Sequence, residues 1–291
     1  VQCHSGWDWG PALMVSGVYE ELYLGATDRE RIESVRLFLS AREGSERKEW
    51  IANFVIELFA YEAGRVSLSA SLAGRSAEHS VDVAAGTSSV NMVLEINDPE
   101  LWWPNGYGEQ PLYDAVVNSD NDSWSATVGF RTLELINDAD ELGNSLVFRI
   151  NGRDVFAKGA NWIPADAMPS RQTPEVLQRL LEDAAAANMN MLRVWGGGQY
   201  ESRKFYELCD RLGILIWQDF MFSCSLYPSD REFLTSVRSE VSYQVKRLQH
   251  HPSIALWCGN NENVGALTWY EVSRKNRDRY IIDYDRLNEG A

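Results

Sequence analysis

The period of the hydrophobic and polar positions changes near residue 135. Before that point, β-rich segments of a few residues are separated by polar or glycine breaks, which predicts strands at residues 34–40, 54–59, 66–70, 90–96, 111–117 and 125–131. Short strands at this spacing are typical of a β-sandwich. We therefore expect a sandwich over about residues 32–135.

Beyond residue 135, apolar strands alternate with amphipathic helices. We predict strands at residues 154–160, 191–195, 214–219 and 254–258, and helices at residues 174–188, 201–212, 231–250 and 267–273. Thr173 and Pro174 suit the start of the first helix as N-cap and first helical residue, and Gly213 suits the end of the second. Apolar strands that alternate with helices indicate a parallel sheet covered by helices.

Polar and aromatic residues collect where these strands are predicted to end. They are Asn161, Trp162, Arg193, Trp195, Asp219, Asn261 and Glu262. Functional residues in such folds lie at the carboxyl ends of the strands. Aromatic faces can stack on a sugar, while amides and carboxylates can bind its hydroxyls, so the set suits a neutral polyol. Glu262 beside Asn261 could supply a proton donor and a hydroxyl-binding group for glycoside chemistry.

Each of these residues also has a structural interpretation. The run of residues 257–263 could be a turn cluster, because asparagine and glycine are common in turns. Trp162 and Trp195 could pack in the core, and Arg193 with Asp219 could form an ion pair beneath the site. Trp217 and Trp257 lie within strands, where core packing is the favoured interpretation.

Composition narrows the class of partner. The 291 residues are 45% hydrophobic and 24% charged, which suggests about two domains. A net charge of −15 argues against nucleic acid or an anionic membrane as partner, because both would repel the protein. The four cysteines lack zinc-like spacing, so we expect thiols and no metal or cofactor. A lysosomal, secreted or intracellular location fits equally well, and no pattern bears on oligomeric state.

Six runs carry a resemblance to a known family. They are residues 6–11 (GWDWGP), 101–108 (LWWPNGYG), 156–166 (FAKGANWIPAD), 192–198 (LRVWGGG), 217–222 (WQDFMF) and 257–263 (WCGNNEN). Through them the chain resembles the β-mannosidases of glycoside hydrolase family 2. The Asn-Glu pair is shared with galactosidase and glucuronidase relatives, whereas the Trp-Asp-Trp-Gly-Pro and Trp-Gly-Gly-Gly runs look specific to the mannosidase branch.

The resemblance implies a multidomain β plus α/β fold. Residues 1–25 would be the tail of a jelly-roll domain, residues 26–134 an immunoglobulin-like sandwich, and residues 135–291 the first half of a (β/α)8 barrel. The implied activity is retaining exo-hydrolysis of terminal, non-reducing β-D-mannosides, with a β-mannoside or manno-oligosaccharide as substrate.

The resemblance also implies roles for single residues. Glu262 would be the general acid/base, and Asn261 would bind the hydroxyl at C2 of the sugar. Trp195 and Trp162 would line the sugar subsite, with Trp269 at its entrance. Asp8 would reach over the barrel mouth to hydroxyls at the far side of the mannose. One hydroxyl contact in such a polar site can discriminate strongly between sugars.

The chain departs from the family pattern in its catalytic pair. A retaining enzyme needs a second carboxylate about 5–5.5 Å away, which in this family is a glutamate at the end of the seventh barrel strand. Residues 135–291 hold four strand–helix units, whereas a full barrel takes roughly 250 residues. Asp219 and Asp166 are poorly placed substitutes. Neighbouring strands are about 4.8 Å apart, and an aspartate one strand away is better placed to orient groups than to attack the sugar from the opposite side. We expect a partial chain that carries the acid/base half of the site and is inactive alone.

Two alternatives stay open. The polypeptide could be a non-catalytic carbohydrate-binding protein, because it holds one of the two carboxylates. It could also belong to an enzyme that acts on another β-glycoside, such as a galactoside, glucuronide or glucosaminide.

Overall fold

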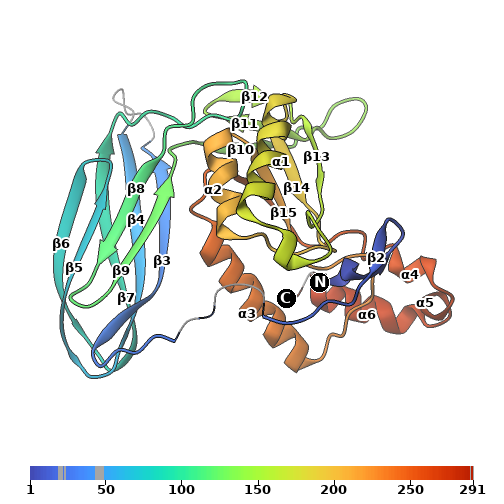
Figure 1. Cartoon of the computed structure of the whole chain (residues 1–291), viewed down its shortest axis with the longest axis horizontal. Coiled ribbons are helices and arrows are strands. Elements are labelled where there is room, and N and C mark those ends of the chain that lie inside the picture. Colours follow the sequence, from blue (N-terminus) through green and yellow to red (C-terminus); the bar gives the residue numbers. More distant parts are fainter. Residues whose placement is uncertain (19–21, 23, 43–48, 289, 291) are drawn as a thin grey trace.

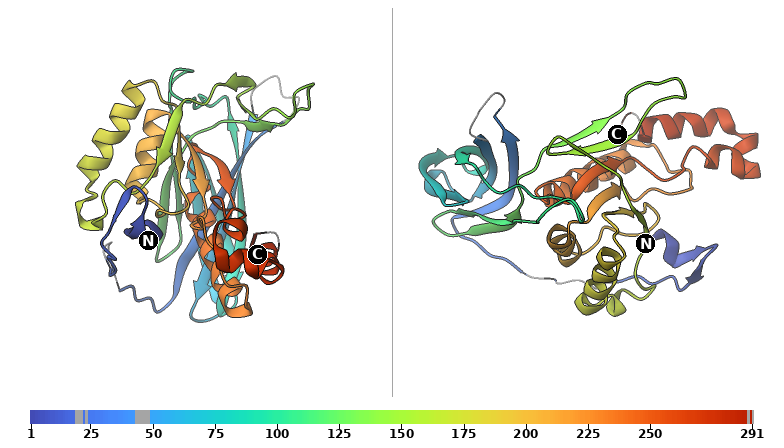
Figure 2. Two further views of the ribbon diagram at one scale, coloured as in Figure 1. Left: turned by 90° about the vertical axis from the view of Figure 1, so that its right-hand side faces the viewer. Right: turned by 90° about the horizontal axis from the view of Figure 1, so that it is seen from above.

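The computed structural model describes the chain except residues 19–21, 23, 43–48, 289 and 291. An all-β part lies on one side of the molecule and an α/β part on the other, as Figure 1 shows. Figure 2 gives the same arrangement from the side and from above. The predicted change from β to α/β structure is therefore observed.

The all-β part is a sandwich of two antiparallel sheets. One has the order β3 (Glu30–Ala41), β4 (Glu49–Ala60), β7 (Gly86–Asn97), and the other the order β6 (Arg75–Val83), β5 (Gly64–Leu72), β8 (Tyr113–Asn118), β9 (Ser123–Val128). Burial alternates along β4, so that Phe54, Ile56 and Leu58 face the core between the sheets. The strand β6 was not predicted, because it is an edge strand whose side chains are mostly polar and exposed.

A small sheet joins the sandwich to the α/β part. It consists of β10 (Leu133–Ile136), β11 (Val147–Ile150) and β12 (Arg153–Val155), so a boundary after residue 134 would fall inside β10. The single strand expected at residues 154–160 is wrong. The chain leaves this sheet after β12 and enters another as β13 (Gly159–Trp162). A hydrophobic pattern cannot show which partner each half of such a segment pairs with.

The α/β part is built on four parallel strands in sequential order. These are β13, β14 (Met191–Val194), β15 (Leu215–Asp219) and β16 (Ile254–Cys258). The helices α1 (Pro174–Ala186), α2 (Arg203–Leu212) and α3 (Arg231–Leu248) connect them. The predicted alternation is confirmed, with one correction: Asn161, Trp162, Arg193 and Asp219 belong to the last residues of their strands and do not follow them.

The helix ends follow from their local sequences. The hydroxyl of Thr173 accepts a hydrogen bond from the amide of Val176 at 3.4 Å, and Asp230 accepts one from Phe233 at 3.0 Å at the start of α3. Gly213 ends α2 with a left-handed φ of 71°. The helix expected at residues 267–273 is instead two, α4 (Ala266–Trp269) and α5 (Glu271–Lys275), followed by α6 (Arg277–Asn288).

The N-terminal segment packs on the α/β part. It contains a 3-10 turn (Gln2–His4) and the hairpin β1 (Ser5–Trp7), β2 (Gly10–Ala12); a second 3-10 turn (Pro169–Arg171) precedes α1. The amide of Cys3 donates to the carbonyl of Gly197 at 2.9 Å.

Within the described residues, no helix has the length and apolar character needed to span a membrane.

Candidate functional site

An ion pair lies at the carboxyl end of the parallel sheet. Arg193 on β14 binds both carboxylate oxygens of Asp219, the last residue of β15, at 2.7 and 3.2 Å. The Asp219 side chain is fully buried and also accepts a hydrogen bond from the amide of Gly196 at 3.0 Å. Burial raises the pKa of Asp219, and the Arg193 charge opposes that rise. The pair is therefore a buried, bidentate contact between neighbouring strands.

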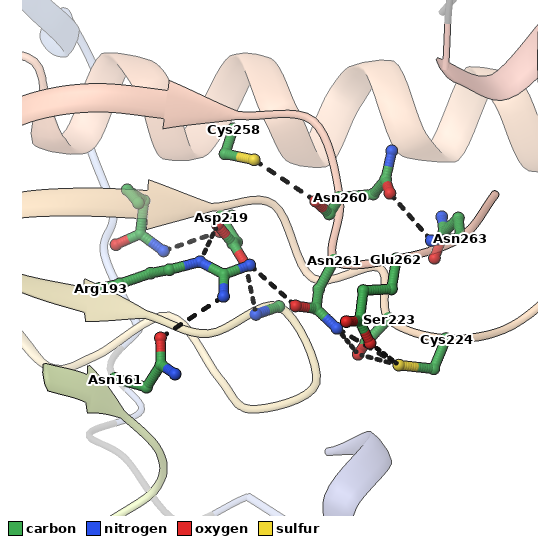
Figure 3. Close-up of polar contacts among 12 residues, drawn as sticks. Asn161, Arg193, Asp219, Ser223, Cys224, Cys258, Asn260, Asn261, Glu262 and Asn263 are labelled. Carbon is green, nitrogen blue, oxygen red and sulfur yellow. Dashed lines mark hydrogen bonds and ion pairs between the residues drawn. The ribbon is translucent and has the colours of Figure 1, made fainter. Parts of the chain in front are cut away.

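The ion pair orients the amide of Asn261, as Figure 3 shows. Arg193 Nη2 donates to Asn261 Oδ1 at 2.8 Å, and its Nη1 reaches Asn161 Oδ1 at 3.4 Å. On its other side, Asn261 Nδ2 donates to Ser223 Oγ at 3.1 Å and to Cys224 Sγ at 3.3 Å. These contacts on both sides fix the orientation of the Asn261 amide.

Glu262 presents its carboxylate differently from Asp219. Glu262 is exposed, and its Oε2 lies 3.4 Å from the sulfur of Cys224. Its backbone has φ of +57°, an uncommon conformation for a residue other than glycine. The Glu262 carbonyl accepts a hydrogen bond from the amide of Gly265 at 2.9 Å, which closes a turn. The turn thus directs a solvent-accessible carboxylate beside the buried ion pair.

The loop that follows β15 runs alongside the Asn261 turn. Asn261 N donates to the carbonyl of Phe222, and Cys224 N donates to the carbonyl of Asn261, both at 2.8 Å. The N-terminal segment holds this loop in turn: Gln2 Nε2 donates to the carbonyl of Ser223 at 2.7 Å, and the Tyr227 hydroxyl donates to Gln2 Oε1 at 2.9 Å.

Aromatic side chains surround Trp195, which is 8% exposed. Trp7 and Trp9 meet its ring edge-on, with centroids at 4.9 and 5.6 Å. Asp8 lies between these two residues at the exposed turn of the hairpin. The Trp195 ring lies against Gly197, where a Cβ atom would come within 1.9 Å of it. Sequence reasoning named Asp8 but missed Trp7 and Trp9, although the Trp-Asp-Trp run contained the signal.

Two further tryptophans have different surroundings. Trp162 packs on Phe205 with centroids at 4.9 Å, and its indole nitrogen donates to Glu201 Oε1 at 3.0 Å. Trp269 is the last residue of α4, is 48% exposed, and lies over Gly265. Sequence reasoning missed Glu201, which is buried in a loop where no local pattern marks it.

The cysteines and possible metal ligands form no cluster in the part of the chain that the structure describes. No group of three or more His, Cys, Asp or Glu residues is placed to hold a metal ion there. The described thiols Cys3, Cys209, Cys224 and Cys258 are all free.

The sequence and the architecture are similar to those of known proteins. Residues 35–131 match the family model of the glycosyl hydrolases family 2. A β-mannosidase of Capra hircus is 40% identical over 304 residues, an alignment that covers 99% of this chain and 34% of that protein. The chain is similar to glycosyl hydrolases of family 2 and, along nearly its whole length, to β-mannosidases. It is also 38% identical over 90% of its length to β-mannosidase B of Emericella nidulans, of which it covers 32%.

Solved structures also resemble the chain. The crystal structure of a β-D-mannosidase from Dictyoglomus thermophilum matches it with a TM-score of 0.84 and 40% identity, over 90% of this chain and 33% of that one. An exo-chitosanase from Amycolatopsis orientalis matches at a TM-score of 0.70 and 18% identity, over 79% of this chain and 28% of that one, which shows a shared fold alone. The chain spans about a third of the length of the curated relatives it matches.

Proposed function

We propose that the protein containing this chain is a retaining exo-β-mannosidase that hydrolyses terminal, non-reducing β-D-mannosides. The observation that carries the proposal is the placing of an exposed carboxylate, Glu262, directly after an amide, Asn261, that the buried Arg193–Asp219 pair holds in one orientation. The likeness to β-mannosidases over nearly the whole chain supports the choice of sugar.

In this proposal Glu262 is the general acid/base. Its exposed carboxyl protonates the oxygen of the leaving group and, in the second step, takes a proton from the attacking water. Asn261 binds the hydroxyl at C2, since its Oδ1 has a second lone pair beyond the one that Arg193 uses. Arg193 and Asp219, whose polar atoms bind each other and their neighbours, act by orienting Asn261.

The aromatic residues and Asp8 would shape the sugar subsite. Trp195, which Trp7 contacts edge-on, would line the subsite with the small part of its ring that stays exposed next to the strand ends. We assign Trp162 to the wall of the same subsite and the half-exposed Trp269 to its entrance. Asp8, at the tip of the hairpin, would bind hydroxyls at the far side of the mannose.

The mechanism needs a nucleophile about 5–5.5 Å from the acid/base. Asp219 is unsuited, because it is fully buried and bound to Arg193. Asp166 is unsuited as well, because Arg171 binds it at 3.0 Å and the amide of Met168 donates to it at 2.8 Å. We therefore assign the nucleophile to a part of the protein outside these 291 residues, in keeping with the third of its relatives' length that the chain spans.

Substitution of Glu262 tests the proposal. In the full-length protein, Glu262→Gln should lower kcat/KM on aryl β-mannosides with poor leaving groups by roughly 10²–10⁴-fold, because these need a proton. Activated dinitrophenyl mannosides should lose much less, and azide should restore turnover. Glu271→Gln is a matched control, since Glu271 is an exposed glutamate on α5 that pairs with Lys275.

Three other results would contradict the proposal. Normal hydrolysis of both substrate kinds by Glu262→Gln would remove the acid/base assignment. Turnover of a galactoside, glucuronide or glucosaminide in preference to mannosides would change the substrate. Mannose binding by calorimetry without hydrolysis of any glycoside would favour a non-catalytic carbohydrate-binding protein.

A further inference from the structure

The sulfur of Cys224 makes three polar contacts beside the proposed acid/base. It lies 3.4 Å from Glu262 Oε2, 3.3 Å from Asn261 Nδ2 and 3.4 Å from Ser223 Oγ, as Figure 3 shows. The Oε2 atom of Glu262 can accept a hydrogen bond when the carboxylate is ionised and also when Oε1 carries the proton, whereas the amide and the hydroxyl can donate. The sulfur therefore accepts from Asn261 and Ser223 and directs its own S–H toward Glu262.

The thiol keeps the proton that this contact requires. Burial raises the pKa of Cys224 most, the hydrogen bond from Ser223 opposes that rise, and the nearby Glu262 carboxylate adds to it, with Asn261 as the smallest opposing effect. A free cysteine already has a pKa near 8.5, so Cys224 is a neutral donor at pH 7. It is not a thiolate that would repel the glutamate.

The backbone brings these two side chains together in an unusual way. Cys224 and Glu262 both have left-handed φ angles, +50° and +57°, which residues other than glycine rarely adopt. They follow Ser223 and Asn261, which face each other in a parallel bridge. Left-handed residues other than glycine cluster at functional sites, where the surrounding structure maintains them.

The loop that carries the thiol is fixed more firmly than the glutamate. Ser223 N donates to the Tyr227 hydroxyl at 2.7 Å, and the Ser223 carbonyl accepts from Gln2 at 2.7 Å. The glutamate side chain, in contrast, is exposed and has three rotatable bonds. A fixed donor beside a flexible carboxylate limits the directions in which that carboxylate can point.

We propose that Cys224 is a positioning residue for Glu262, whose carboxylate it holds through an S–H hydrogen bond in the orientation needed for proton transfer. This inference rests on the proposed role of Glu262 as general acid/base. It assigns to the thiol an effect on the step in which the leaving group receives its proton. Misplacement of a reacting group by about 1 Å can cost 10²-fold in rate, so a weak hydrogen bond can matter here.

Two variants of the full-length protein test the proposal by substrate dependence. Cys224→Ala should lower kcat about tenfold on phenyl β-mannoside, a smaller loss than removal of the acid itself, and about twofold or less on a dinitrophenyl mannoside. Cys224→Ser, which keeps a donor, should recover most of the phenyl mannoside rate. Cys258→Ala is the control, because its sulfur contacts the carbonyl of Asn260 at 3.3 Å instead, and it should change both rates by the same factor.

A second measurement tests the contact without any hydrolysis. Removal of the Glu262 charge should lower the pKa of the Cys224 thiol, so iodoacetamide should alkylate Cys224 several-fold faster at pH 8 in Glu262→Gln than in the parent protein. The alkylation of Cys258, followed in the same samples by peptide mass spectrometry, should not change.

The outcomes separate this inference from the proposed function. Equal losses on both mannosides in Cys224→Ala, no loss on either, or an unchanged Cys224 alkylation rate in Glu262→Gln would overturn the positioning role. If Glu262→Gln itself shows no dependence on the leaving group, the acid/base assignment fails, and the alkylation result still reports whether thiol and carboxylate interact.

Discussion

Removal of the arginine from the buried ion pair should destabilise the protein strongly. In Arg193→Ala, the Asp219 carboxylate, which is fully buried, loses two hydrogen bonds at 2.7 and 3.2 Å together with its counter-charge. The amide of Gly196 would still donate to it at 3.0 Å. The variant therefore leaves a buried charge with partial compensation.

The expected cost is about 3–5 kcal/mol in the free energy of unfolding at pH 8, the usual penalty for removing one partner of a buried pair. Arg193 is 24% exposed, which places the loss toward the lower end of that range. A typical protein has about 5–15 kcal/mol in total, so the variant should fold but unfold at clearly lower urea concentration. Urea titration followed by tryptophan fluorescence measures the loss.

The loss should also depend on pH in one direction. Burial already raises the pKa of Asp219 above its usual value, and without Arg193 that pKa rises further. A carboxyl with a raised folded pKa contributes stability that is complete below its unfolded pKa, about 3.9, and is lost as pH rises through the folded pKa. The difference between Arg193→Ala and the parent protein should thus grow from pH 4 to pH 8.

A double variant serves as the control. Arg193→Ala with Asp219→Asn has no buried carboxylate, so its stability relative to the parent protein should not show the added loss toward pH 8. A cost below about 1 kcal/mol at pH 8, or an equal cost for Arg193→Ala at both pH values, would refute the view that the pair is a buried charge contact.

Two further substitutions test how the sandwich is joined to the α/β part. Trp102 is fully buried and donates from Nε1 to the carbonyl of Asp210 at 2.7 Å. Trp102→Phe leaves that carbonyl unpaired, so it should lower the free energy of unfolding by about 1–3 kcal/mol. A lower urea midpoint would show this loss, and an unchanged midpoint would contradict it. Lys246 on α3 donates to Glu57 on β4 at 2.8 Å and lowers the pKa of Glu57. The stability that this pair contributes is therefore present above the pKa of Glu57 in the unfolded chain and is lost as the pH falls through its lowered pKa in the folded protein. Glu57→Gln should cost about 1 kcal/mol or less at pH 7 in low salt and nothing near pH 3, and a cost that persists in acid would argue against the pairing.

Hydrophobic period predicted the elements whose burial is one-sided. The strand β4 alternates buried and partly buried residues along its whole length, and α3 has its apolar residues at helical spacing. The edge strand β6 carries too few buried side chains to show a period of two. The split between β12 and β13 escaped because a strand's partner is set by contacts distant in sequence, such as the close approach of Gly159 to Met191.

The core of the candidate site was predictable for a related reason. Parallel strands end at one edge of a sheet, so residues at successive strand ends, here Arg193, Asp219 and Asn261, must come together. Contacts between loops follow no such rule. Gln2 and Ser223 are 221 positions apart, and nothing in either local sequence indicates their hydrogen bond.

The two carboxylates of the site lie in opposite environments, and this contrast separates their effects. Asp219 is buried and fixed by Arg193, so changes there should appear first in stability. Glu262 is exposed at the end of a turn, so its loss should leave stability nearly unchanged and appear in the chemistry. Cys224 lies between these cases, because it contacts both Glu262 and the Asn261 amide that the ion pair holds. If Cys224→Ala lowered stability alone, the thiol would have a structural role like that of Asp219. A loss of rate that depends on the leaving group would instead show that the thiol acts on Glu262.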